Sequence, residues 1–113
     1  MILKNGATYR FLSREAESDA GTNGKGRSLN VYGTQPTSLA NVCLYTSDDS
    51  DICQQWVYVE DSDGLKYLKC KGNMDLALDL YTGASSVVGV RNCNAHVFEP
   101  SETSRIEVED AGG

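Results

Sequence analysis

The residues with the most definite chemistry are Gln54 and Trp56, which flank Gln55 around the only tryptophan of the chain. Residues 53–59 (C-Q-Q-W-V-Y-V) place apolar side chains at alternate positions, which is typical of a half-buried strand. In such a strand Gln54 and Trp56 point to the same face. A glutamine beside a buried tryptophan needs hydrogen-bond partners, and loop backbone groups can supply them. The Q-x-W triplet therefore indicates a polar tie between a strand and its neighbouring loops.

Acid–base chemistry would need carboxylates that face each other, and the candidate pairs are Asp48/Asp49 and Glu107/Glu109. The first pair lies in a turn-like S-D-D-S-D segment, and the second is spaced for one exposed face of a strand. A glycosidase needs two carboxylates across a cleft, with separated pKa values. His96 lies on an apolar stretch without a nucleophile motif, and no glycine motif for phosphate or dinucleotide binding is present. We therefore expect no catalytic residue and no enzymatic activity.

The bulk composition predicts one small globular domain over residues 1–113. Sixteen acidic residues against ten basic ones give a net charge of −6, which disfavours nucleic acid and anionic membrane surfaces as partners. No apolar stretch is long enough to span a bilayer, and no signal-peptide pattern opens the chain.

The four cysteines, Cys43, Cys53, Cys70 and Cys93, form no C-x-x-C pair, and there is one histidine. A zinc site is therefore not expected, and neither is another metal or cofactor. Their order in the chain favours the disulfides Cys43–Cys53 and Cys70–Cys93, which would indicate an extracellular setting. Free, buried thiols are the alternative.

The apolar residues come in short bursts separated by Gly, Ser, Asn, Asp and Thr, without a helical stripe. Regular spacing of such bursts predicts an all-β sandwich or barrel. The nine predicted strands are residues 8–12, 28–32, 41–46, 55–60, 65–70, 77–81, 87–91, 95–99 and 105–108.

An internal repeat relates the two halves of the chain. Residues 29–34 (L-N-V-Y-G-T) align with residues 78–83 (L-D-L-Y-T-G), an offset of 49 (78 − 29). In each half we expect a strand before this segment, a cysteine-containing strand after it, and then a fourth strand. The third and fourth strands of the second half are expected at residues 88–93 and 96–99.

This order of motifs resembles the ricin-B-type (R-type) lectins, the same modules as family 13 carbohydrate-binding modules. The resemblance covers residues 6–109 and rests on S-L-N-V at 28–31, V-C-L-Y at 42–45, Q-Q-W at 54–56 and A-L-D-L at 77–80. It implies a β-trefoil with two complete four-stranded repeats, about 6–60 and 61–102, and the first strand of a third in 103–113. The missing strands leave three readings: a piece of a longer chain, completion by a second chain, or a smaller rearranged β fold.

Each unit of this family can hold a shallow sugar pocket, in which an aromatic ring stacks on the sugar and polar groups bind its hydroxyls. The resemblance also implies a structural role for Trp56, for Gln54 and for the four cysteines. Asn30 stands where the family usually has aspartate, and Arg91 stands at the position expected for the aromatic residue of the second unit. The carbohydrate-binding candidates carried over by position are Asn30, Tyr45, Asp48 and Gln54 in the first unit and Asp79, Arg91, Asn92 and Asn94 in the second.

From the resemblance we predict non-catalytic carbohydrate binding by a targeting module of a secreted polysaccharide-acting protein. The expected partner is a polysaccharide or glycan. A catalytic domain in the parent chain, or a second copy completing the trefoil, would be the protein partner. The alternative is a β-trefoil protein-interaction or structural domain of the inhibitor or toxin-subunit type, with degenerate sugar sites. Exposure of Tyr45 in a pocket beside Asn30 distinguishes the two.

Overall fold

The computed structural model describes residues 2–13, 21, 24–84, 91–101 and 104–106. Within these residues the protein is all-β, as the sequence predicts, and the short 3₁₀ turn η3 (Ile52–Gln54) precedes β5. Over the same residues, no helix has the length and apolarity needed to cross a membrane. The strands are β1 (Thr8–Tyr9), β2 (Leu12–Ser13), β3 (Arg27–Val31), β4 (Val42–Thr46), β5 (Trp56–Glu60), β6 (Lys66–Cys70), β7 (Asn73–Ala84) and β8 (Arg91–Phe98).

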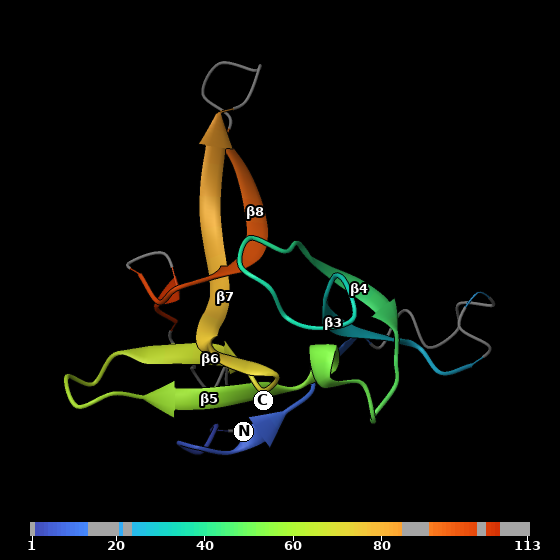
Figure 1. The fold of residues 1–113 in the computed structure, drawn as a ribbon, viewed down its shortest axis with the longest axis horizontal. Coiled ribbons are helices and arrows are strands. Elements are labelled where there is room, and N and C mark those ends of the chain that lie inside the picture. The colour runs from blue at the N-terminus through green and yellow to red at the C-terminus, as the bar shows by residue number, and fades with distance from the viewer. Residues whose placement is uncertain (1, 14–20, 22–23, 85–90, 102–103, 107–113) are drawn as a thin grey trace.

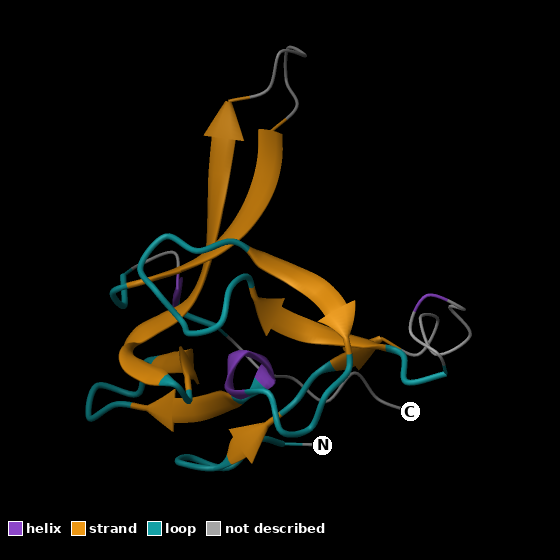
Figure 2. Ribbon diagram, turned by 45° about the vertical axis from the view of Figure 1, so that its right-hand side comes forward, coloured by secondary structure: helices purple, strands orange, loops and turns teal. Residues whose placement is uncertain are grey.

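The strands form two antiparallel sheets. The larger has the order β1-β5-β6-β7-β8, and the smaller has the order β2-β3-β4. Figure 1 shows β5 and β6 side by side at the base of the molecule, with β3 and β4 beside them and β7 and β8 rising away from them. Figure 2 shows that the far half of the β7–β8 hairpin extends beyond the rest of the protein.

Three of the predicted strands differ from the observed ones, and a fourth lies mostly outside the described residues. The first, residues 8–12, is divided, because β1 pairs with β5 in one sheet and β2 pairs with β3 in the other. The predicted strand at 95–99 is only the last part of the longer strand β8, which begins at Arg91, and residues 87–90 of the predicted strand at 87–91 lie outside the described part. Of the ninth predicted strand, Arg105 and Ile106 are described and form no strand.

The internal repeat corresponds to two hairpins with the same register. Asn30 pairs with Cys43 in the β3–β4 hairpin, and Asp79 pairs with His96 in the β7–β8 hairpin. In the same register, Tyr45 opposite Ser28 corresponds to Phe98 opposite Ala77. The third strand of the second half is therefore the end of β8, and the expectation that it lies at 88–93, followed by a fourth strand at 96–99, was wrong.

The core joins the two sheets around Trp56. The Trp56 side chain is 0% exposed, and its indole Nε1 donates a hydrogen bond to the carbonyl oxygen of Leu29, 3.2 Å away in the other sheet. Strand β5 lies between β1 and β6, so strands flank Trp56 on both edges, while its side chain packs in the buried cluster. The buried cluster consists of Val31, Cys53, Trp56, Tyr58, Leu68, Cys70, Leu76, Leu78 and Val97.

Both predicted disulfides are wrong, because Cys43, Cys53 and Cys70 are free thiols. The side chain of Cys93 lies outside the described part. Cys43 and Cys53 are not cross-strand neighbours, since Cys43 pairs with Asn30 and Cys53 lies in η3, where its thiol contacts the carbonyl oxygen of Gly33 at 3.4 Å. Cys70 is buried opposite Trp56.

Truncating the central tryptophan should destabilise the fold. We expect Trp56→Ala to lower the free energy of unfolding by about 3–5 kcal/mol, because it leaves a large cavity and removes an inter-sheet hydrogen bond. Chemical denaturation measures this change. The control is Tyr32→Ala, which truncates a 71% exposed ring and should change stability by no more than about 0.5 kcal/mol. A Trp56→Ala midpoint equal to that of the wild type would contradict this packing.

The thiols should differ in reactivity. Burial, with a smaller effect from Cys53, raises the pKa of Cys70 to about 12, and burial also raises the pKa of Cys53. Because the thiolate is the reactive form, both should resist iodoacetamide in the native protein at pH 8, whereas the partly exposed Cys43 should react first. Peptide mapping after native and denatured labelling measures the difference. A mass deficit of two hydrogens under non-reducing conditions, mapped to any of these three residues, would contradict their free state.

Candidate functional site

The polar centre next to the core is the carboxamide of Gln54, which is 0% exposed. Its Oε1 accepts hydrogen bonds from the Asp48 backbone N–H at 2.9 Å, from the Ser28 hydroxyl and from Arg10 Nη2 at 3.3 Å. Its Nε2 donates to the carbonyl oxygen of Thr46 at 2.8 Å. These hydrogen bonds are of the kind expected for the structural role predicted for Gln54. Its complete burial argues against the second role assigned to it, direct contact with a sugar.

This network holds the segment that leads from β4 into η3. Within it, Asp48 Oδ1 accepts hydrogen bonds from the Ser50 hydroxyl at 2.7 Å and from the Ser50 N–H at 3.0 Å. These two bonds, helped by the charges of Lys25 and Arg10, hold the pKa of Asp48 below its ordinary value. Asp51 caps η3 by accepting a hydrogen bond from the Cys53 N–H at 2.9 Å. A short, hydrogen-bonded loop thus separates two cavities.

The first cavity combines aromatic, amide and carboxylate groups. Its volume is about 270 Å³, and its lining residues are Asn30, Tyr32, Gly33, Tyr45 and Asp51. Both rings are accessible, since Tyr32 is 71% exposed and Tyr45 is 58% exposed. The structure therefore brings together two of the predicted carbohydrate-binding residues, Asn30 and Tyr45.

Asn30 is held in a fixed orientation at this cavity. It is 5% exposed, and its Nδ2 donates to the carbonyl oxygen of Val31 at 3.0 Å and contacts Cys43 Sγ at 3.6 Å. Its side-chain oxygen accepts no hydrogen bond from the residues that the structure describes. That oxygen therefore keeps its hydrogen-bonding capacity on a side chain that lines the cavity.

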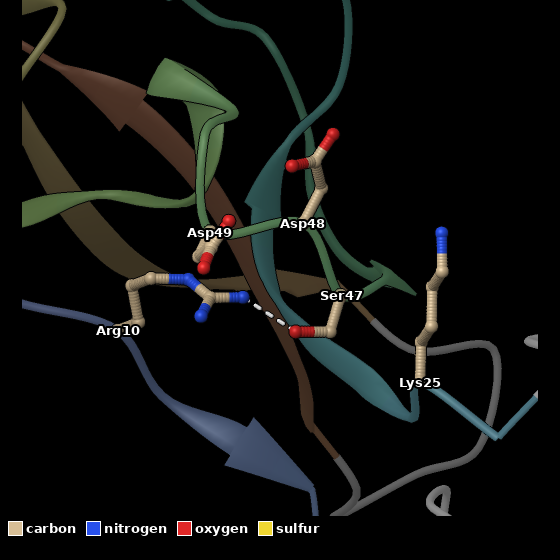
Figure 3. Close-up of a pocket in the computed structure, with 5 residues that line it drawn as sticks. All are labelled: Arg10, Lys25, Ser47, Asp48 and Asp49. Atoms are coloured by element: carbon tan, nitrogen blue, oxygen red, sulfur yellow. Dashed lines mark hydrogen bonds between the residues drawn. The ribbon is translucent and has the colours of Figure 1, made fainter.

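The second cavity, on the other side of the loop, mixes opposite charges (Figure 3). It measures about 350 Å³ and is lined by Arg10, Lys25, Ser47, Asp48 and Asp49. The guanidinium of Arg10 reaches across to the Ser47 hydroxyl, with Asp49 beside it, while Asp48 and Lys25 extend away from it. Asp48, predicted to contact the same sugar as Asn30, thus lines a different cavity.

Among the carbohydrate-binding candidates of the second half, the Asp79 carboxylate is buried and has a partner within the protein. Asp79 is 4% exposed, and its Oδ2 lies 2.5 Å from His96 Nε2, which stands at the ladder position of Cys43. His96 is therefore the partner of a buried carboxylate. Phe98, rather than Arg91, takes the position of Tyr45, because Arg91 pairs with Ala84 at the far end of the hairpin. The backbones of Arg91, Asn92 and Asn94 lie in β8, and their side chains are outside the described part.

Two residues that line the first cavity, Tyr32 and Asp51, were not among the candidates predicted from the sequence. Tyr32 follows Asn30 by two positions, and this spacing in a strand places both on one face. Asp51 precedes η3 as an N-cap, but the S-D-D-S-D segment reads simply as a turn.

No protein-family model matches the chain, and no curated protein matches it either.

Replacing the buried glutamine should destabilise the loop between the cavities. We expect Gln54→Leu to lower the free energy of unfolding by at least about 1–3 kcal/mol, because it strands the Asp48 N–H and the Thr46 carbonyl oxygen without their partner. Thermal or chemical denaturation measures the loss. The matched control is Gln55→Leu, since Gln55 makes one longer side-chain bond, to the Asp49 carbonyl oxygen at 3.3 Å. Equal stability of the two variants would contradict the role given to Gln54.

Proposed function

We propose that this protein binds carbohydrate, without catalysis, in the cavity formed by Asn30, Tyr32, Gly33, Tyr45 and Asp51. The observation that carries the proposal is the exposed ring of Tyr45 beside the oriented amide oxygen of Asn30. A sugar presents an apolar face of C–H groups and a rim of hydroxyls. Tyr45 offers a surface for the first, while Asn30 and Asp51 offer acceptors for the second.

The size of the cavity suits a single sugar ring. A volume of about 270 Å³ lies just below the range of about 300–1,000 Å³ that drug-sized ligands occupy. A chain of several sugars would therefore place one ring in the cavity and the others over the surface. Binding at one such pocket is weak, and linked copies or a linked catalytic domain raise the apparent affinity. This behaviour fits the targeting module of a polysaccharide-acting protein.

For the fold we propose a β-trefoil-like arrangement. In the first half, β5 returns to pair with β1 after the β3–β4 hairpin. In the second half, the Ile106 N–H donates to the Lys66 carbonyl oxygen at 2.9 Å, so the chain returns to β6 after the β7–β8 hairpin. In this arrangement residues 105–106 take the place of a fourth strand of the second repeat, instead of opening a third repeat.

The exposure of Tyr45 favours sugar binding over the alternative of a protein-interaction domain with degenerate sites. A degenerate site would have its aromatic ring buried or separated from the acceptor of β3. Here Tyr45 is more than half exposed and lines the same cavity as Asn30.

Removing either the ring or the acceptor should weaken binding. We expect Tyr45→Ala and Asn30→Ala each to reduce affinity for the best ligand by about tenfold, the equivalent of about 1.4 kcal/mol. A glycan array and pull-down with insoluble polysaccharides identify the ligand, and calorimetry measures the affinities. The matched control is Leu44→Ala. Leu44 is the neighbour of Tyr45 in β4 and is half exposed, but it is not among the residues that line the cavity. A folded protein that binds no carbohydrate would refute the proposal.

A further inference from the structure

The two cavities beside the β4–η3 loop differ in charge. The cavity at Arg10 and Lys25 balances two cations against the carboxylates of Asp48 and Asp49. The cavity at Tyr45 contains a single formal charge, the carboxylate of Asp51, and neither a lysine nor an arginine is among its lining residues. A ligand in the cavity at Tyr45 therefore meets the negative charge of Asp51, and no cationic side chain among the lining residues offsets that charge.

The carboxylate of Asp51 is held in place by the backbone. Its Oδ1 accepts the hydrogen bond from the Cys53 N–H, and the Asp51 N–H donates to the Asp48 carbonyl oxygen at 3.1 Å. The carboxylate also lies against the Cys53 thiol, whose pKa it helps to raise, and the other described residues donate no hydrogen bond to it. Asp51 therefore presents an oriented anionic acceptor, and binding would not have to immobilise a flexible side chain.

The aromatic groups favour the same sign of ligand charge. The face of a tyrosine ring attracts cations, and the attraction strengthens when an ammonium group is partly removed from water. Tyr32 and Tyr45 both line the cavity of Asp51 with accessible rings. The net charge of −6 on the whole chain also attracts cations to its surface and repels anions.

We propose that this cavity takes a sugar that carries a protonated amine, a hexosamine with a free amino group, in preference to neutral, N-acetylated or acidic sugars. The inference rests on the carbohydrate binding proposed above. The ammonium group of the sugar binds the Asp51 carboxylate beside the tyrosine rings, and a hydroxyl group of the sugar donates to Asn30 Oδ1.

The test compares four oligosaccharides of equal length by calorimetry at pH 5.5: β-linked glucosamine, its fully N-acetylated form, the neutral glucose analogue and a uronate. We expect the glucosamine oligomer to bind at least tenfold more tightly than the other three. We also expect this preference to shrink severalfold between 20 mM and 500 mM NaCl, because salt screens the charge of an accessible carboxylate. Equal or tighter binding of a neutral or acetylated oligomer would overturn the amine preference and leave carbohydrate binding intact. Failure of all four to bind would count against both proposals.

Variants locate the charge that is responsible. Asp51→Asn keeps a side-chain oxygen that can cap η3, so a thermal melt should show a folded protein. We expect it to lose about tenfold in affinity for the glucosamine oligomer and to lose less for the neutral oligomer, because the amide oxygen of the new side chain still accepts a hydrogen bond from a hydroxyl. The matched control is Asp49→Asn, which removes an equal charge from the other cavity and should preserve the preference. Preference retained in Asp51→Asn, or lost equally in both variants, would show that Asp51 does not select the amine.

Discussion

The structure depends on one buried, uncharged group, the carboxamide of Gln54. Its oxygen and nitrogen connect the β3 hydroxyl of Ser28, the end of β4 at Thr46 and the backbone of Asp48. A buried amide deprived of any of these partners would be destabilising, and bonds within such a network strengthen one another. The ends of the smaller sheet, the loop after β4 and η3 are therefore fixed together, next to the tryptophan that joins the sheets.

The loop after β4, which these hydrogen bonds fix in place, is the wall that the two cavities share. Because the loop is hydrogen-bonded at Asp48 and capped at Asp51, its carboxylates are divided between two sides. Asp48 and Asp49 face the side with Arg10 and Lys25, and Asp51 lines the side with the tyrosines. A sequence of five small polar residues thus yields one charge-balanced cavity and one cavity with a single negative charge.

The two hairpins show how the same ladder supports different chemistry. Asn30 and Asp79 occupy equivalent positions, opposite Cys43 and His96. The neutral amide of Asn30 binds its own strand and retains an open oxygen, whereas the carboxylate of Asp79 is buried against the imidazole of His96. A buried carboxylate needs such a partner. The carbohydrate site that we propose accordingly lies at the first hairpin and not at the second.

The sequence by itself determined the all-β class, the positions of β3 to β6, the buried tryptophan and its glutamine, and the pair Asn30 and Tyr45. The strands and the buried residues follow from side-chain alternation and local spacing, which neighbouring residues encode, whereas Asn30 and Tyr45 were carried over by position from the family resemblance. Only the tertiary structure decided that β8 pairs along β7 so that Phe98 corresponds to Tyr45, that the described cysteines remain free, and that Asp51 rather than Asp48 joins the tyrosines. Register and cavity walls depend on contacts between residues far apart in the chain, and a one-residue change in pairing moves every side chain of a strand to its other face.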